Sequence, residues 1–176
     1  IFSILLLLCF GIVTVVEAQP AAVKKAANTT FTLTTFDSNG SILSTSNGVF
    51  VSNDGIGVST WKPFVGAMKA MVTDNDGQKY DVETMLGANE LYDVAKFKVA
   101  AKTHAAPFAP SVAASSTAWI VVPAKVGDPI KANINKVEKF MTKYNYCVLS
   151  TTAPEKNNGA PLLNDKGQLV GIYNSN

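Results

Sequence analysis

The chain has 176 residues, of which 47% are hydrophobic, and it carries 15 basic residues against 13 acidic ones. All of the basic residues are lysines, and they are scattered among acidic residues. Proteins that read nucleic acids rely on arginine and on clustered basic stripes, so we expect no nucleic-acid partner. Because the first residue is isoleucine and not methionine, we expect the sequence to be a fragment.

An apolar run, IFSILLLLCFGIVTVVEA, occupies residues 1–18. Val16 and Ala18 are small residues at the third and first positions before Gln19, a pattern typical of signal-peptidase cleavage. We therefore expect a cleaved signal peptide at residues 1–18. The alternative is a membrane anchor, because the run approaches the length of a short transmembrane helix. Once the signal is removed, residues 19–176 are long enough for one domain and have a net charge near +3.

Short β-rich runs separated by turn residues follow one another through the first half. They are FTLTTF (31–36), GVFVS (48–52), GVSTW (57–61), KAMVTD (69–74), YDVETMLG (80–87) and VAKFKVA (94–100). The segments DSNG, SNDG, DNDG and GANE lie between them. Regularly spaced short strands with Asn-Gly and Asp-Gly turns are typical of an antiparallel sandwich or barrel.

The second half repeats this pattern after a connector rich in alanine, proline and serine. Its runs are AWIVVPA (118–124), PIKANINKVEKF (129–140), YNYCVLST (144–151), PLLN and QLVGIY. We predict an all-β fold of two barrel-like lobes, at about 31–102 and 117–176, joined by the connector at about 103–116. Residues 19–30 are expected to form an N-terminal linker, because no long helical periodicity appears after the signal.

Residues suited to metal or redox chemistry are isolated in this sequence. Cys147 stands alone once the signal is removed, and no His/Cys cluster has metal-ligand spacing. His104 lies in the connector, where we expect an exposed loop residue. The segment DNDG (74–77) lacks the glycine and glutamate positions of a calcium loop, so we predict a hairpin turn there. We expect neither a metal nor a cofactor.

Three further segments occur in a suggestive order. They are SNGVFVSNDGIGVSTWKPFVGAMKAMV (46–72), ELYDVAKFKVA (90–100) and TTAPEKNNGAPLLNDKGQLVGI (151–172). The first resembles the strand, Asp-Gly turn and histidine segment of trypsin-like peptidases of the HtrA/Deg kind. The second resembles that family's aspartate segment, and the third its Gly-Asn-Ser-Gly nucleophile loop and the strand after it. The resemblance spans about residues 31–173, and it implies the two-barrel trypsin-like fold.

The resemblance places other residues where the family has its catalytic ones. Lys62 stands at the histidine position, Asp93 at the aspartate position and Asn158 at the serine position. The family's oxyanion hole uses backbone N–H groups that correspond here to Asn158 and Lys156. Lysine replaces a glycine at position 156, so we expect that hole to be distorted or collapsed.

The replacements remove the chemistry of the serine route. The amine of Lys62 starts from a pKa of about 10.4 and stays protonated at neutral pH, so it cannot act as the base. The amide of Asn158 is not an acyl-transfer nucleophile. A salt bridge between Lys62 and Asp93 is expected in their place. Pro63 is expected to hold Lys62 in an extended conformation.

We therefore predict an exported, catalytically degenerate trypsin-like peptidase homologue that binds an extended peptide or an unfolded envelope-protein segment. The alternative is an active serine-type endopeptidase of envelope quality control that uses non-standard groups, such as Ser150 with Lys62 as base. Decay without a selected function also stays open. The resemblance implies a periplasmic or extracellular location, no cofactor, and no membrane contact after signal cleavage. The chain stops three residues after Tyr173, so either the sequence is truncated or the second barrel is incomplete.

Overall fold

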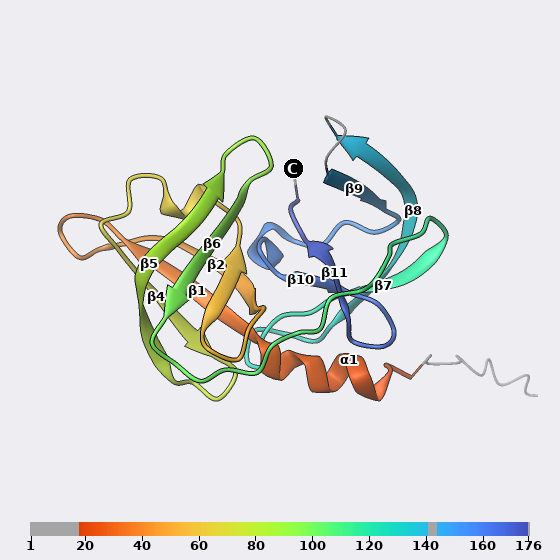
Figure 1. Ribbon diagram of the computed structural model, residues 1–176, viewed down its shortest axis with the longest axis horizontal. Coiled ribbons are helices and arrows are strands. Elements are labelled where there is room, and N and C mark those ends of the chain that lie inside the picture. The colour runs from red at the N-terminus through yellow and green to blue at the C-terminus, as the bar shows by residue number, and fades with distance from the viewer. Residues whose placement is uncertain (1–17, 141–143, 176) are drawn as a thin grey trace, which may run out of the picture.

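The structure is a computed structural model that describes residues 18–140 and 144–175. Two β lobes lie side by side, with a short helix beneath both (Figure 1). The apolar run predicted to be a signal peptide lies outside the described residues, except for Ala18. Within the described ranges, no helix is long and apolar enough to cross a membrane.

Lobe 1 is a closed barrel in which the strands follow the order β1-β2-β3-β6-β5-β4. Every neighbouring pair in this barrel is antiparallel. The strands are β1 (Thr30–Phe36), β2 (Ile42–Phe50), β3 (Ile56–Ser59), β4 (Lys69–Asp74), β5 (Lys79–Asn89) and β6 (Val94–Val99). Each of them overlaps the run predicted for it.

Lobe 2 is a five-stranded antiparallel sheet in the order β11-β10-β7-β8-β9, which curls into a nearly closed barrel. Its strands are β7 (Ser116–Ile120), β8 (Ile130–Phe140), β9 (Tyr144–Leu149), β10 (Pro161–Leu163) and β11 (Leu169–Ile172). The prediction of a two-lobed all-β fold is confirmed. Among the described residues, lobe 2 has one strand fewer than lobe 1.

Three of the hairpin turns share one local design. An Asp or Asn side chain accepts hydrogen bonds from the main-chain N–H groups two and four residues later, and a glycine three residues later has a positive φ. These turns begin at Asp37, Asp74 and Asn164. Carboxylate and amide side chains favour such turns, and glycine takes the left-handed conformation without steric cost. The segment DNDG is therefore a hairpin turn, as predicted.

Aromatic side chains fill the interior of lobe 1. The Phe31 ring centroid lies 4.6 Å from that of Phe50 and 5.7 Å from that of Phe97. Gly48 makes room for this cluster, because a Cβ atom there would lie 2.3 Å from the Phe31 ring. The alternation of buried and outward residues in β1 and β6 comes from this core, since successive side chains of a strand point to opposite faces.

The helix α1 (Ala21–Ala26) lies in the segment expected to be a linker, and the short 3-10 turn η1 (Ala27–Thr29) leads from it into β1. Val23 of α1 is fully buried in a hydrophobic cluster that contains Val49 of lobe 1 and Trp119 of lobe 2. Gly167 lets the β10–β11 turn approach the helix, since a Cβ atom there would lie 2.9 Å from the carbonyl oxygen of Ala22. The helix therefore packs against both lobes.

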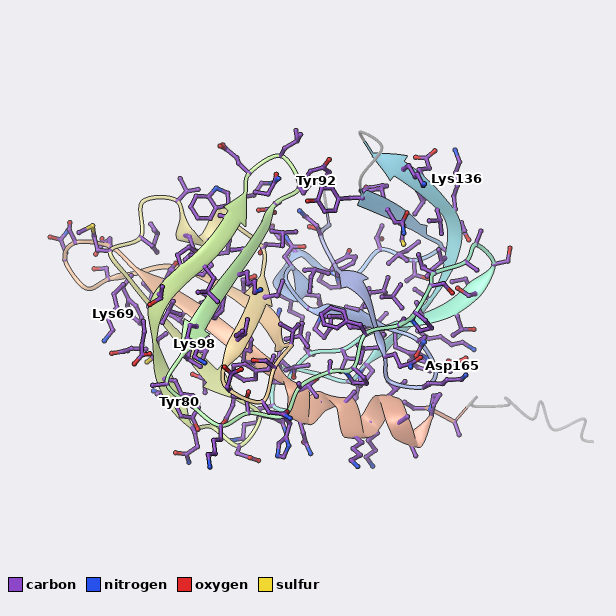
Figure 2. The ribbon with its side chains drawn as sticks, viewed as in Figure 1. Lys69, Tyr80, Tyr92, Lys98, Lys136 and Asp165 are labelled. Atoms are coloured by element: carbon purple, nitrogen blue, oxygen red, sulfur yellow. The ribbon has the colours of Figure 1, made fainter. Side chains whose placement is uncertain are left out.

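A pair of tyrosine rings joins the lobes at the edge away from α1. Tyr92 lies in the β5–β6 connection, on the side of lobe 1 that faces β9 (Figure 2). Its ring centroid lies 4.5 Å from that of Tyr144, the first residue of β9, and the rings are tilted by 60°. Aromatic pairs of this kind are worth about 0.5–1.5 kcal/mol beyond their buried area.

Candidate functional site

Asp93 links the two lobes through its carboxylate. Its Oδ1 atom accepts hydrogen bonds from the N–H groups of Trp61 at 2.9 Å and Lys62 at 2.8 Å. Its Oδ2 atom accepts one from the side-chain amide of Asn174 at 2.8 Å, just after β11. The residue is 9% exposed and has a φ of 50°, a conformation that aspartate adopts more readily than most residues. Three donors therefore fix this carboxylate between the lobes.

Lys62 begins the 3-10 turn η2 (Lys62–Phe64), and its side chain is exposed. The extended conformation expected from Pro63 is wrong. Proline fits the start of a helical turn, where its missing N–H is not needed. The expected salt bridge is also wrong, because no ion pair joins Lys62 to Asp93 among the described residues. The contact between the two residues is made by the main-chain N–H of Lys62.

Asn158 also braces the lobes, through both its main chain and its side chain. Its carbonyl oxygen accepts hydrogen bonds from the N–H of Asn47 at 2.9 Å and the hydroxyl of Ser46 at 2.8 Å, both on β2. Its side-chain Oδ1 atom accepts the N–H of Ser175 at 2.7 Å. At the position where the family has its nucleophile, this chain therefore has a residue that fixes the surrounding main chain.

The main chain before Asn158 forms the 3-10 turn η3 (Glu155–Asn157). The N–H of Asn158 donates to the carbonyl of Glu155 at 2.8 Å, inside this turn. The carbonyl of Lys156 accepts a hydrogen bond from the side-chain amide of Asn47 at 2.7 Å, which ties the turn to lobe 1. The donor that would serve an oxyanion at position 158 is thus already engaged.

Gly159 allows η3 to lie against β2. Its φ is 80°, and a Cβ atom there would lie 2.1 Å from the carbonyl oxygen of Asn47. Only glycine accepts both that dihedral angle and that approach. The glycine after the nucleophile position therefore has a structural role that does not depend on catalysis.

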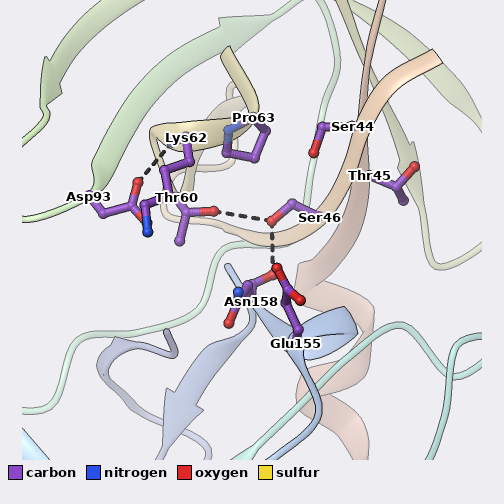
Figure 3. Close-up of a pocket in the computed structure, with 9 residues that line it drawn as sticks. All are labelled: Ser44, Thr45, Ser46, Thr60, Lys62, Pro63, Asp93, Glu155 and Asn158. Carbon is purple, nitrogen blue, oxygen red and sulfur yellow. Dashed lines mark hydrogen bonds between the residues drawn. The ribbon is translucent and has the colours of Figure 1, made fainter. Parts of the chain in front are cut away.

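Lys62, Asp93 and Asn158 meet in one cavity of about 210 Å³ at the junction of the lobes (Figure 3). Its lining comes from β2, the end of β3, η2, the start of β6 and η3: Ser44, Thr45, Ser46, Thr60, Lys62, Pro63, Asp93, Glu155 and Asn158. Two of the hydroxyls are committed, since Ser46 Oγ and Thr60 Oγ1 lie 3.1 Å apart and Ser46 also contacts Asn158. Lys156 does not line the cavity.

Ser150, the hydroxyl considered for displaced chemistry, does not line this cavity. Its Oγ atom accepts the N–H of Asn133 on β8 at 2.9 Å. The sequence did not single out Asn47, Asn174 or Ser175, which contact the predicted site residues directly. Asn47 lies in the triplet SNG, where the family pattern has Ser or Thr, and that departure was the one available signal.

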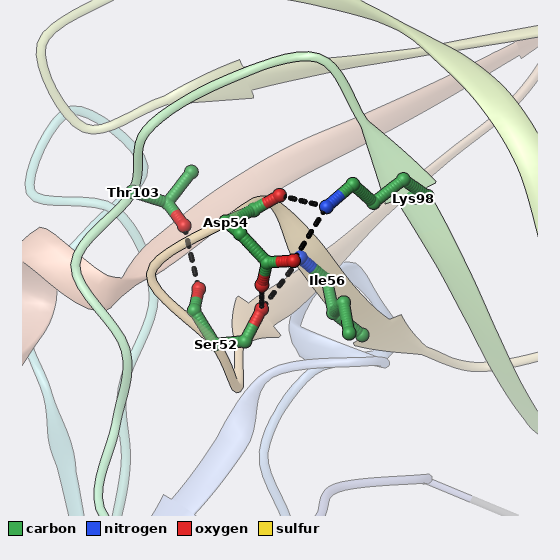
Figure 4. A network of polar contacts seen from close by, with 5 residues as sticks. All are labelled: Ser52, Asp54, Ile56, Lys98 and Thr103. Carbon is green, nitrogen blue, oxygen red and sulfur yellow. Dashed lines mark hydrogen bonds and ion pairs between the residues drawn. The ribbon is translucent and has the colours of Figure 1, made fainter.

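A second polar cluster lies outside the cavity and ties the β2–β3 turn to β6 (Figure 4). The ammonium of Lys98 lies 2.7 Å from Oδ2 of Asp54, and Ser52 donates a hydrogen bond to the same carboxylate. Thr103 donates to the carbonyl of Ser52 at 2.7 Å. The hydrogen bonds from Lys98 and Ser52 lower the pKa of Asp54 to about 2. No group of metal-ligating side chains occurs in the part of the chain that the structure describes.

A closed six-stranded barrel, a second nearly closed one, and a cavity at their junction define the class of chymotrypsin-fold proteins. The model of the trypsin-like peptidase domain family matches residues 32–172, so the chain belongs to that family.

Individual proteins are similar to this chain in sequence or in fold. HhoA of Synechocystis sp., a protein assigned as a serine protease, is 26% identical over 143 residues, which cover 72% of this chain and 35% of HhoA. Among solved structures, the HtrA-type protease AlgW with a tripeptide has a TM-score of 0.76 at 21% identity, over 88% of this chain and 53% of that one. A serine endoprotease from Yersinia pestis has a TM-score of 0.73 at 20% identity, over 87% and 56%. The chain thus spans about a third to a half of the length of these proteins.

Proposed function

We propose that this chain is a trypsin-like peptidase homologue that does not cleave peptide bonds by the serine route and that binds an extended peptide in the cavity between its lobes. The observation that carries the proposal is the meeting of Lys62, Asp93 and Asn158 in one cavity. At the three family positions the cavity presents the amine of Lys62, the carboxyl group of Asp93 and the carboxamide of Asn158. This set contains neither the imidazole nor the hydroxyl that the serine route requires.

The geometry of η3 supports the loss of catalysis independently of the side chains. Stabilising an oxyanion requires main-chain donors that are directed at the place where charge develops. The N–H of Asn158 donates to the carbonyl of Glu155, and the side-chain amide of Asn47 donates to the carbonyl of Lys156, which ties the turn to lobe 1. Replacing Asn158 by serine alone would therefore supply a hydroxyl but would still leave no free main-chain donor at position 158 for an oxyanion.

The edge of β2 supports peptide binding by strand addition. β2 pairs with β1 along most of its length, but it pairs with β3 only from Gly48 to Phe50. The main-chain groups of Asn47 point away from β1, toward Asn158 and Ser59. Because main-chain direction alternates along a strand, the N–H and C=O of Thr45 point to the same unpaired side, beside the cavity. An extended peptide can pair there without any catalytic group.

AlgW is solved with a tripeptide, which supports the proposal that this chain binds a peptide. Export is proposed together with it, because the apolar run and the small residues Val16 and Ala18 are typical of a cleaved signal peptide. Expression of the chain with its N-terminal run in a secreting host tests export. A mature N-terminus at Gln19 in the exported fraction supports it, and retention of the uncleaved chain contradicts it.

Two measurements test the central proposal. Purified protein should neither hydrolyse casein nor react with a fluorophosphonate, which labels only activated serines. Hydrolysis that disappears on Lys62→Ala, or labelling of any serine in the cavity, contradicts the loss of catalysis and supports the alternative of displaced chemistry.

Peptide binding is measured by fluorescence anisotropy against a library of extended peptides. The best binder is then remade with N-methyl groups at alternate positions, which removes main-chain donors and leaves the side chains intact. We expect one of the two N-methyl registers to lose binding by at least about tenfold, as loss of backbone hydrogen bonds requires. The variant Thr45→Pro should weaken binding, whereas Thr45→Ala, which keeps the N–H, should not. Binding that is indifferent to both changes refutes strand addition on β2.

A further inference from the structure

Within residues 18–140 and 144–175, the outer edge of β5 has no partner strand along most of its length. β4 and β5 pair only at Met71↔Asp81, Val72↔Tyr80 and Thr73↔Lys79, although β5 continues to Asn89. Beyond Val82, the described residues supply β5 with a partner strand on the β6 side alone. The barrel is closed, but β5 runs on beyond the end of its pairing with β4 and leaves an opening between the two strands, where no partner strand among the described residues pairs with the outer edge of β5 from Glu83 to Asn89.

This edge is exposed and partly apolar. Every residue from Glu83 to Asn89 is exposed, and Met85 and Leu86 have 39% and 48% of their surface accessible. Met68, across the opening, is 75% exposed. Unpaired strand edges that carry apolar side chains are templates for pairing with another chain, and proteins usually blunt them with charges or bulges.

A hollow of about 160 Å³ lies at the same opening. Its lining comes from η2, the segment after it, the start of β4, and β5: Phe64, Ala67, Met68, Lys69, Ala70, Val82 and Met85. Lys69, which is labelled in Figure 2, lines the hollow and is paired with Asp81 at 3.0 Å, so its charge is partly balanced. An apolar side chain of a strand added to β5 would have this hollow beside it.

The charges along the edge indicate what kind of strand fits. Glu83 and Glu90 lie near its two ends, and no lysine lies between them. A strand with an apolar centre and basic ends therefore complements the edge. A second copy of β5 does not, because antiparallel self-pairing brings Asp81, Glu83 and Glu90 of one copy close to the acidic residues of the other.

We propose that the outer edge of β5, from Glu83 to Asn89, is a second docking site that takes an extended peptide segment with alternating apolar residues and basic ends. This site lies on the outside of lobe 1 and shares no lining residue with the cavity between the lobes. It goes beyond the proposed function and does not depend on it.

The test uses a blocked peptide of alternating valine and threonine between terminal lysines, titrated by fluorescence anisotropy into the whole chain. Hydrogen exchange is measured on the same complex. We expect saturable binding and slower exchange of the amides from Thr84 to Asn89. Binding should weaken about tenfold on Met85→Lys and should fall with added salt. The matched control Phe108→Lys changes a 65% exposed aromatic residue in the connector, and it should leave binding unchanged.

A charge swap tests the chemistry even if one variant binds poorly for structural reasons. The variant E83K/E90K should lose affinity for the lysine-ended peptide and gain affinity for the same peptide with glutamate ends. Equal binding of both peptides to both proteins overturns the basic-ended assignment. Protection at β2 in place of β5, or no saturation at millimolar peptide, overturns the site. Self-association that protects β5 without added peptide assigns the edge to a second copy and also overturns the proposal.

The two sites are distinguished in the same experiment. Thr45→Pro should weaken strand addition on β2 and leave the protection of β5 intact. Met85→Lys should do the reverse. Failure of one proposal therefore leaves the other measurable.

Discussion

Restoring the family's side chains should not by itself restore its chemistry. We consider the double variant Lys62→His, Asn158→Ser, and a triple variant that adds Lys156→Gly. In the parent chain the N–H of Asn158 donates to the carbonyl of Glu155 at 2.8 Å, and we expect the double variant to keep this main-chain hydrogen bond. Losing one oxyanion donor costs a serine protease about 10²–10³ in rate. The double variant should therefore react with a fluorophosphonate at least about 100-fold more slowly than an intact peptidase.

The Lys156→Gly change in the triple variant is meant to let the main chain of η3 change conformation. Glycine adopts positive φ without steric cost, so the turn at η3 can change and release the N–H at position 158. The hydrogen bonds to be given up are the one to Glu155 and the one from Asn47 to the carbonyl of residue 156. Each is worth about 0.5–1.5 kcal/mol net, an amount that binding of the transition state can offset. The triple variant should react faster than the double variant by about tenfold or more.

The assay is single-turnover labelling with a fluorophosphonate, followed by intact-mass spectrometry, with the Asn158→Ala form of each variant as control. Equal labelling rates for the double and triple variants would show that η3 does not limit the chemistry. Labelling of the parent chain would refute the reasoning, because it would show that the chain already has an activated serine at a position other than 158.

Three further predictions follow from individual residues. Gly159→Ala should lower the free energy of unfolding, measured in urea, by about 2–4 kcal/mol, because Gly159 has a positive φ and main-chain atoms lie close to it. The control Gly40→Ala should lower it by only about 1 kcal/mol, because Gly40 also has a positive φ but has open space around it. The hydrogen bonds from Lys98 and Ser52 lower the pKa of Asp54 to about 2. The pairing with Lys98 therefore stabilises the fold at pH values above about 4, and this contribution is lost as the pH falls from about 4 to about 2. Titration of the Asp54 carboxyl group by NMR tests this, and a midpoint near 4 would contradict the pairing. Burial raises the pKa of Cys147, so iodoacetamide at pH 8 should alkylate the folded chain more slowly than the chain unfolded in urea, and equal rates would contradict the burial.

The strands were predictable because their signals are local. Turns beginning at Asp37, Asp74 and Asn164 each end a run with a side-chain cap and a glycine, and the intervening runs are rich in residues that favour strands. The helix α1 was not predicted. Six residues are too few to show helical periodicity, and two buried side chains hold this segment in place through contacts distant in sequence.

The sequence named three residues that the structure places in one cavity, but it did not predict the contacts that those residues make. The family pattern named Lys62, Asp93 and Asn158, and the structure brings the three together. The expected ion pair failed because main-chain donors and Asn174 already occupy the carboxylate of Asp93, and main-chain direction cannot be read from residue types. The opening between β4 and β5 was not predicted either, because the sequence indicates how long a strand is but not where its pairing with a neighbour stops.

The position of α1 has a mechanical consequence for the whole molecule. The helix lies beneath the junction of the lobes (Figure 1). Its Val23 side chain packs in one cluster with side chains of both lobes. If one lobe rotated outward to widen the cavity, α1 would lose its contacts with that lobe, and the apolar surface around Val23 would be exposed to water. We therefore expect α1 to resist movement of one lobe relative to the other, and removal of the residues before Thr30 should make the cavity easier to widen.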